Sequence, residues 1–192
     1  MAKAAMKNSN SGQSGKNTAV PAKSLTSSDL ENQLQRTTSK LQQTEMLLSV
    51  TRKIAGLKNL SEILWTLIAM TTEELGADRG SLFLNDPLTG ELYSRVAQGD
   101  LTREIRILNT TGIAGSIFQS GEGEIIHSAY EDERFNSKID EQTGYVTKNI
   151  VCAPVRTVRN DVIGVIQILN KKRGRFTKED LDIVEAITAQ AA

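Results

Sequence analysis

The segment from Val162 to Asn170 restricts the fold more than any other part of this chain. Its sequence, VIGVIQILN, has apolar residues at both odd and even positions. Successive side chains of a strand point to opposite faces, so both faces of this strand must be covered. We therefore expect a central strand, with helices on one face and a second covering layer on the other. The apolar run Asn149–Val158 precedes it, and the residues Arg159–Asp161 between the two suit a hairpin turn.

Alternating and turn-bounded apolar runs indicate four further strands, at residues 81–84, 91–96, 105–108 and 124–126. Helical spacing of apolar residues predicts a helix from Leu60 to Leu75, a short helix from Gly112 to Gly121 and a last helix after Thr177. Residues 129–147 form an irregular segment with helical turns. The expected fold class is α+β: a central antiparallel sheet of about six strands, helices on one face and a ligand-covering segment on the other.

Charge and cysteine content exclude several classes of protein. The chain of 192 residues has 23 basic and 23 acidic side chains. Four of the lysines precede Asp29, so the remainder is acidic and offers no basic face for nucleic acid or a membrane surface. The single cysteine, Cys152, excludes an internal disulfide and fits a reducing compartment. No apolar run has membrane-spanning or signal-peptide character, so we expect a cytoplasmic protein.

Three regions follow one another along the sequence. Residues 1–27 contain almost no large apolar groups and are predicted to be a disordered tail. Residues 28–57 are predicted to be a helix that acts as a linker and dimerisation element, and 58–192 a folded domain. The apolar pattern of the last helix continues to the end of the sequence without a stop signal, so that helix is predicted to be truncated.

The N-terminal helix has leucines on one face at positions 30, 34, 41 and 48. Thr37, Thr38 and Thr44 interrupt a full heptad seam, so a long helix is expected but not a strong coiled coil. Two interpretations stay open: the helix packs on its own domain, or it also pairs with a second copy of the chain.

A cluster of polar residues opens directly onto the strand that begins at Ile150. Asp140, Thr143 and Thr147 supply a carboxylate and two hydroxyls beside a buried sheet, which suits the polar edges of a small ligand between apolar walls. Alternatively, the threonines cap turns and Asp140 is a solvated loop acid. The only histidine, His127, has no cysteine or second histidine near it in the sequence. We therefore expect binding rather than catalysis, no metal site and no cofactor. Arg79 is interpreted as a surface or interface charge.

Four motifs together resemble the GAF domain, the small-molecule sensing module of cyclic-nucleotide phosphodiesterases and cyanobacterial adenylate cyclases. The motifs are Gly112–Gly115, Ala129–Phe135, Asp140–Asn149, and Asn170-Lys171 followed by Phe176 and Asp180. The resemblance covers roughly residues 47–192. The last set is similar to the Asn-Lys/Phe/Asp-Glu signature of the nucleotide-binding members, although its final acid is Leu181 here.

The resemblance implies roles for particular residues. Ser81 would approach the base, the backbone at Ile113 and Ala114 would meet a cyclic phosphate, and Asp140 would accept from an amine or ribose hydroxyl. Gln167 stands where some relatives have an acid, and Ala97 and Gln98 stand where some have Phe and Asp. The implied ligand-binding set is Ser81, Ala97, Gln98, Ile113, Ala114, Asp140, Thr143, Thr147 and Gln167.

The same resemblance implies a structural brace rather than a ligand contact around Lys171. Lys171 and Asp180 would form a salt bridge between the last strand and the last helix, beside Asn170 and Phe176.

The implied function is that of a regulatory sensor domain that binds a cyclic nucleotide, cyclic AMP in preference to cyclic GMP. It would signal through its terminal helices to an output such as an adenylate cyclase, as a homodimer through the 28–57 helix and the C-terminal helix. The chain itself is not expected to be an enzyme. The alternatives are a degenerate domain that serves only in dimerisation, or a sensor of another small ligand such as a bilin.

Overall fold

The computed structural model describes residues 27–55, 57, 59–99 and 104–189. The disordered tail predicted for residues 1–27 therefore lies outside the described residues, except for Ser27. The chain falls into two compact units, and the boundary between them in the sequence lies after Thr38. A helix, α1, spans Ser27–Ile54, in the region where the sequence predicts the linker helix.

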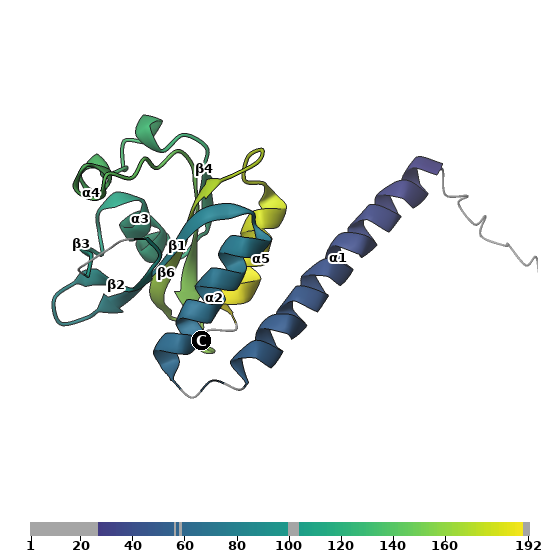
Figure 1. The fold of residues 1–192 in the computed structure, drawn as a ribbon, viewed down its shortest axis with the longest axis horizontal. Coiled ribbons are helices and arrows are strands. Elements are labelled where there is room, and N and C mark those ends of the chain that lie inside the picture. Colours follow the sequence, from purple (N-terminus) through teal and green to yellow (C-terminus); the bar gives the residue numbers. More distant parts are fainter. Residues whose placement is uncertain (1–26, 56, 58, 100–103, 190–192) are drawn as a thin grey trace, which may run out of the picture. The chain divides into compact units, whose positions relative to one another are not determined.

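The described strands form one antiparallel sheet, in the order β3-β2-β1-β6-β5-β4 (Figure 1). The predicted α+β class with a six-stranded sheet is confirmed. The strand β6 lies between β1 and β5, as its two apolar faces require. The strand bounds are β1 Ala77–Asp86, β2 Glu91–Ala97, β3 Arg106–Leu108, β4 Glu124–Ile126, β5 Ile150–Arg156 and β6 Val162–Lys171.

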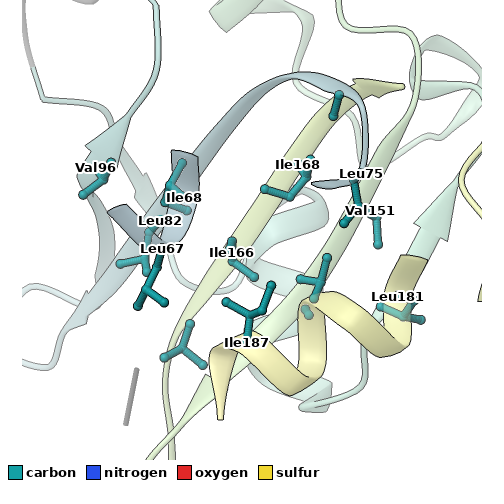
Figure 2. Packing of buried hydrophobic residues seen from close by; sticks show 14 of the residues in the cluster. Leu67, Ile68, Leu75, Leu82, Val96, Val151, Ile166, Ile168, Leu181 and Ile187 are labelled. Carbon is teal, nitrogen blue, oxygen red and sulfur yellow. The ribbon is translucent and has the colours of Figure 1, made fainter. Parts of the chain in front are cut away.

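The helices α2 (Leu60–Glu74) and α5 (Lys178–Thr188) lie together on one face of the sheet (Figure 1). Their apolar stripes meet the side chains of β1, β5 and β6 that point to this face, which forms the larger hydrophobic core. Figure 2 shows Ile166 of β6 and Ile187 of α5 directed into the space between sheet and helix. Met46 and Val50, from the part of α1 after Thr38, are buried in the same core.

The opposite face is covered by α3 (Gly112–Ser120), a 3-10 turn at Ala129–Glu131 and α4 (Ser137–Thr143). We call residues 129–147 the covering segment. A second hydrophobic cluster lies beneath these elements and includes Phe83, Ile113, Ile150 and Val165. Because alternate residues of β6 enter the two clusters, this strand joins both halves of the interior.

The end of β6 is tied both to α5 and to the end of the covering segment. The Lys171 ammonium pairs with the Asp180 carboxylate, and Asp180 also accepts the Thr177 N–H at 2.8 Å in the capping box of α5. Asn170, at φ 56°, accepts the Lys148 N–H at 2.6 Å and donates to the Val146 carbonyl at 2.8 Å. Lys171 and Asp180 thus form a salt bridge between β6 and α5, the contact that the resemblance implies for a brace.

Among the residues described, no helix has both the length and the apolar character to cross a membrane.

The closeness of β1 and β6 gives a first prediction. A Cβ added at Gly164 would lie 2.2 Å from the Phe83 carbonyl oxygen, which belongs to the backbone and cannot move aside. We expect Gly164→Ala to lower the free energy of unfolding by about 1–3 kcal/mol, measured by urea denaturation. Gly174→Ala is the control, because a Cβ there meets nothing within 4 Å and only the left-handed backbone is strained. A smaller loss of unfolding free energy for Gly164→Ala than for Gly174→Ala would contradict the expected clash with the Phe83 carbonyl oxygen.

A second prediction concerns the brace. The Lys171 and Asp180 side chains are 19% and 10% exposed, so removing the ammonium leaves a carboxylate that water reaches poorly. We expect Lys171→Met to lower the free energy of unfolding by about 1–3 kcal/mol in the same assay. Lys178→Met breaks the solvent-exposed pair with Asp182 and should leave stability nearly unchanged. Equal effects of the two substitutions would show that burial does not strengthen the brace.

Candidate functional site

A partly open cavity of about 370 Å³ lies between the sheet and the elements that cover it. This volume is in the range of small-molecule sites in proteins. Strands β1, β5 and β6 form its floor, and α3 and the covering segment form its walls. The walls are largely apolar, with side chains that include Phe83, Ile105, Ile107, Ile113, Phe135, Ile139, Ile150 and Leu169.

Of the nine predicted ligand-binding residues, all but Ala97 line this cavity. Ala97 is the last residue of β2 and pairs with Ser81 of β1, but it is not among the residues that line the cavity. It lines a shallow groove beside α2 instead, together with Trp65. Eight of the predicted residues thus border the cavity and Ala97 does not, and the binding roles of all nine stay predictions.

Two polar side chains of the floor lie next to each other, beside the apolar Phe83, Ile150 and Leu169. Ser81 of β1 is directly opposite Gln167 of β6 in the antiparallel pairing, so both point to the same face. The Ser81 hydroxyl has no hydrogen-bond partner in the described part of the chain, although the residue is 9% exposed. The Gln167 amide interacts with the thiol of Cys152 on the neighbouring strand. This pair offers both donors and acceptors to a bound molecule.

The N-terminus of α3 opens onto the cavity. Gly112, at φ 74°, turns the chain into the helix, and Ile113 and Ala114 are buried against the sheet. The capping position, Thr111, makes no side-chain cap. The N–H groups of residues 112–114 meet no acceptor among the described residues, so the positive end of the helix dipole faces the cavity.

The polar cluster that the sequence singles out is engaged with itself. Asp140 is buried, and its carboxylate accepts the Thr147 N–H at 2.6 Å, the Thr147 hydroxyl at 2.8 Å and the Tyr130 hydroxyl at 3.0 Å. The interpretation of Asp140 as a solvated loop acid is therefore wrong. An ionised carboxylate can accept about four hydrogen bonds, so one acceptor position remains for a ligand. The first effect of these bonds is to close the covering segment on itself.

Thr143 and Gln98 also use their polar atoms within the protein. The Thr143 hydroxyl donates to the Ile139 carbonyl at 2.8 Å in the last turn of α4, as the turn-capping alternative proposes. The Gln98 side-chain oxygen accepts the Gly80 N–H at 2.8 Å and the Thr72 hydroxyl at 3.1 Å. Both residues border the cavity, but the Thr143 hydroxyl and the Gln98 oxygen already have partners.

Arg79 and Tyr145 line the cavity, and the sequence interpretation did not include them among the ligand-binding residues. The Arg79 guanidinium lies 3.9 Å from the centre of the Tyr145 ring, and the Tyr145 hydroxyl donates to Asp78 at 2.7 Å. Burial, together with this bond to a carboxylate, raises the pKa of Tyr145. Arg79 is two residues before Ser81 on the same strand, and this alternation was the signal that could have placed it on the cavity face.

Arg134 anchors the covering segment to the rest of the domain. Its guanidinium pairs with Asp132 at 2.7 Å and Glu124 at 2.9 Å, and it donates to the Ser116 hydroxyl at 3.1 Å. Hydrogen bonds to Asp132 and Glu124 raise the pKa of Arg134, and the pKa of Asp132 is lowered in turn. The Arg134 guanidinium, which borders the cavity, is thus already neutralised by two carboxylates.

The chemistry of Cys152 argues against a reactive thiol. The side chain is fully buried on β5, and burial raises its pKa to about 12. A protonated, enclosed thiol is not a nucleophile at neutral pH and gives no rim position for a covalent bilin link. In the part of the chain that the structure describes, no three His, Cys, Asp or Glu side chains are grouped as a metal site.

Comparison with known proteins gives consistent results. The sequence profile of the GAF domain family matches residues 59–192. The chain is 40% identical over 152 residues to the probable 3',5'-cyclic phosphodiesterase pde-5 of Caenorhabditis elegans, covering 72% of this chain and 21% of that protein. It is 36% identical over 155 residues to the dual 3',5'-cyclic-AMP and -GMP phosphodiesterase 11 of Drosophila melanogaster, covering 72% and 11%. The chain therefore spans about a fifth or less of the length of these relatives.

Solved structures share the fold at low sequence identity. The GAF domain from a phosphoenolpyruvate-protein phosphotransferase of Coxiella burnetii superposes with a TM-score of 0.71 at 18% identity, covering 78% of this chain and 89% of that one. The free methionine-R-sulfoxide reductase of Neisseria meningitidis superposes with a TM-score of 0.65 at 17% identity, covering 76% and 83%.

These sequence relatives are phosphodiesterases rather than the cyanobacterial adenylate cyclases that the sequence interpretation placed first. The family itself is the one that the motifs indicated. With the profile match over residues 59–192 and the six-stranded sheet covered on both faces, the chain belongs to the GAF domain family.

Proposed function

We propose that this domain is a regulatory sensor that binds a 3',5'-cyclic nucleotide in the cavity between the sheet and the covering segment. The observation that carries the proposal is the placement of polar groups that can still bond a ligand. At the start of α3, N–H groups without an acceptor among the described residues face the cavity, and the Ser81–Gln167 pair lies on its floor beside apolar side chains.

A cyclic nucleotide has the matching division of chemistry. Its phosphate carries one negative charge, which the N–H groups and dipole at a helix N-terminus favour. Its base is flat and apolar on its faces, with polar atoms only at its edge. In the proposed complex the base lies between the apolar walls, and its edge meets the Ser81 hydroxyl and the Gln167 amide. Asp140 offers its remaining acceptor position to a ribose hydroxyl or an exocyclic amine.

The Ser81 hydroxyl and the Gln167 amide can each donate and accept hydrogen bonds. They can therefore meet the donor and acceptor pattern of the adenine edge as well as that of the guanine edge. The preference for cyclic AMP predicted from the sequence rested on the likeness to cyclases, and the relatives include a phosphodiesterase of both nucleotides and a cGMP-specific one from Drosophila ananassae. We therefore propose a cyclic purine nucleotide and include cyclic GMP as an equal candidate.

In this proposal, ligand binding is signalled through the covering segment. A ligand shifts a conformational equilibrium only through its difference in affinity for the two states. The covering segment supplies Asp140 and Thr147 to the cavity, and its end is held by Asn170 beside the α5 brace. The proposed output is a catalytic domain elsewhere in a longer protein, either a phosphodiesterase or an adenylate cyclase.

A second candidate function has an observation in its favour. Asp140, Thr147 and Gln98 direct polar atoms to partners within the domain, as expected of a GAF domain that has lost its ligand and serves in dimerisation. The two candidates differ in whether any nucleotide binds.

Calorimetric titration with cyclic AMP and cyclic GMP tests the proposal directly. We expect a saturable heat and a rise in melting temperature with at least one of the two, because a ligand that binds only the folded state stabilises it. The corresponding 5'-monophosphate, with its extra charge and open phosphate, is the control and should bind more weakly. Absence of both heat and thermal shift with millimolar ligand would favour the dimerisation candidate.

The hydroxyls of Ser81 and Thr143, which both border the cavity, make a matched pair for substitution. Ser81→Ala removes a hydroxyl without a partner in the described residues, so we expect the dissociation constant of the nucleotide to rise about 2- to 10-fold. Thr143→Ala removes a hydroxyl that already bonds the Ile139 carbonyl and should leave affinity unchanged. The reverse order of effects in calorimetry would show that the nucleotide lies nearer α4 than the Ser81–Gln167 floor.

A further inference from the structure

The end of the covering segment is attached to β1 through the side chain of Tyr145. The Tyr145 hydroxyl donates to the Asp78 carboxylate at 2.7 Å, and the Arg79 guanidinium lies 3.9 Å from the centre of the Tyr145 ring. Asp78 and Arg79 also form an ion pair with each other at 3.9 Å. One aromatic side chain thus contacts two consecutive residues of β1, through a charge-assisted hydrogen bond and a cation–π contact. We call these three side chains the Tyr145 cluster.

The Tyr145 cluster closes one side of the cavity. Tyr145 and Arg79 both line the cavity, and they come from opposite sides of it, the covering segment and the floor strand β1. The guanidinium and the ring are in van der Waals contact, so nothing passes between them unless they separate. Burial and the bond to Asp78 raise the pKa of Tyr145, so its hydroxyl stays protonated and remains a donor at neutral pH.

The backbone beside Tyr145 is held weakly compared with the sheet. Gly144, at φ 67°, ends α4, and a Cβ added there would meet nothing within 4 Å. The Tyr145 N–H meets the Thr143 hydroxyl at 3.4 Å, which is longer than an ordinary hydrogen bond. The next side chain, Val146, is 56% exposed. Segments with exposed side chains and weak backbone hydrogen bonds open at low free energy, so the Tyr145 side chain is a large part of what holds this stretch on β1.

The covering segment is fixed more firmly at a point further from Tyr145. Arg134 bonds Glu124 of β4 at 2.9 Å and Ser116 of α3 at 3.1 Å, and so ties the segment to two other elements. The bonds of Asp140 go to other residues of the covering segment and hold it to itself rather than to the sheet. A motion that opens the cavity therefore starts at Tyr145, and Arg134 is its fixed point.

We propose that the Tyr145 cluster is a latch, whose release lifts the end of the covering segment and sets the rate at which ligand enters and leaves the cavity. The identity of that ligand, a cyclic purine nucleotide, rests on the function proposed above. The latch closes with or without ligand, so its weakening raises the rates of association and dissociation by the same factor and leaves the dissociation constant unchanged.

Amide hydrogen exchange of the ligand-free chain tests the latch without a nucleotide. Tyr145→Phe removes the hydroxyl and keeps the ring. We expect the Lys148 amide to exchange about 3- to 10-fold faster, because it bonds Asn170 only while the end of the covering segment lies on the sheet. The amide of Ile166 on the central strand reports global unfolding and should not change. Unchanged exchange at Lys148, or an equal acceleration at Ile166, would overturn the latch.

A matched control and a second variant make this measurement specific. Tyr93 also lies beside an arginine, Arg106 at 5.3 Å, but its hydroxyl has no hydrogen-bond partner in the described part of the chain. Tyr93→Phe should therefore leave exchange at Lys148 unchanged. Asp78→Ala should accelerate it as Tyr145→Phe does, and the two together by little more than either alone, because both break the same bond. Additive effects would show that Tyr145 and Asp78 do not act as a pair.

Stopped-flow kinetics tests the gating of ligand. The probe is a fluorescent derivative of whichever cyclic nucleotide binds in calorimetry. Tyr145→Phe should raise kon and koff together by about 3- to 10-fold and leave Kd within about 2-fold of the wild-type value. A rise in koff alone would show that the Tyr145 hydroxyl contacts the nucleotide, and unchanged rates would show that ligand enters by another route. Either result would overturn the gating role.

Failure of the latch and failure of nucleotide binding give different results. If exchange at Lys148 accelerates as expected but neither nucleotide binds, the latch stands and the proposed function falls. If a nucleotide binds but Tyr145→Phe changes neither exchange nor the two rates, the proposed function stands and the latch falls.

Discussion

The fold depends on the burial of β6 on both of its faces. Ile166 and Ile168 enter the core beneath α2 and α5, whereas Val165, Gln167 and Leu169 face the cavity side. The neighbouring strands β1 and β5 take their register from β6, and with it the direction of Ser81 and Cys152. A slip of one residue in this strand would exchange core and cavity residues, so the composition of the site follows from the packing of the core.

Much of the fold could be predicted from the sequence because burial is periodic along strands and helices. The apolar pattern of residues 162–170 requires a central strand with two covering layers, and the structure has both. The site is less predictable, since hydrogen-bond partners are chosen by the path of an irregular segment. Nothing periodic relates Asp140 to Tyr130 and Thr147, so the sequence indicates three polar groups but not that they satisfy one another. Arg79 was misplaced for a different reason. Its spacing of two residues from Ser81 places both side chains on the cavity face, but the charge of Arg79 suggested the surface.

The shared fold sets limits on what can be read from resemblance. A methionine sulfoxide reductase has the same architecture at 17% identity, so the sheet and its two layers do not by themselves select a ligand. Selection depends on which polar atoms inside the cavity are left without a partner. Here Asp140 and Thr147 bond each other and stabilise the covering segment, whereas Ser81 and the first N–H groups of α3 have no partner among the described residues.

Asn170 and Lys171 are consecutive, yet their side chains hold different parts of the molecule. Asn170 bonds the backbone of Val146 and Lys148 at the end of the covering segment, and Lys171 pairs with Asp180 in the first turn of α5. Asn170 itself adopts the left-handed backbone conformation. Two adjacent residues at the end of β6 therefore hold both the end of the covering segment and the first turn of α5. The covering segment and α5 are thus connected by polar contacts of residues that belong to neither hydrophobic cluster.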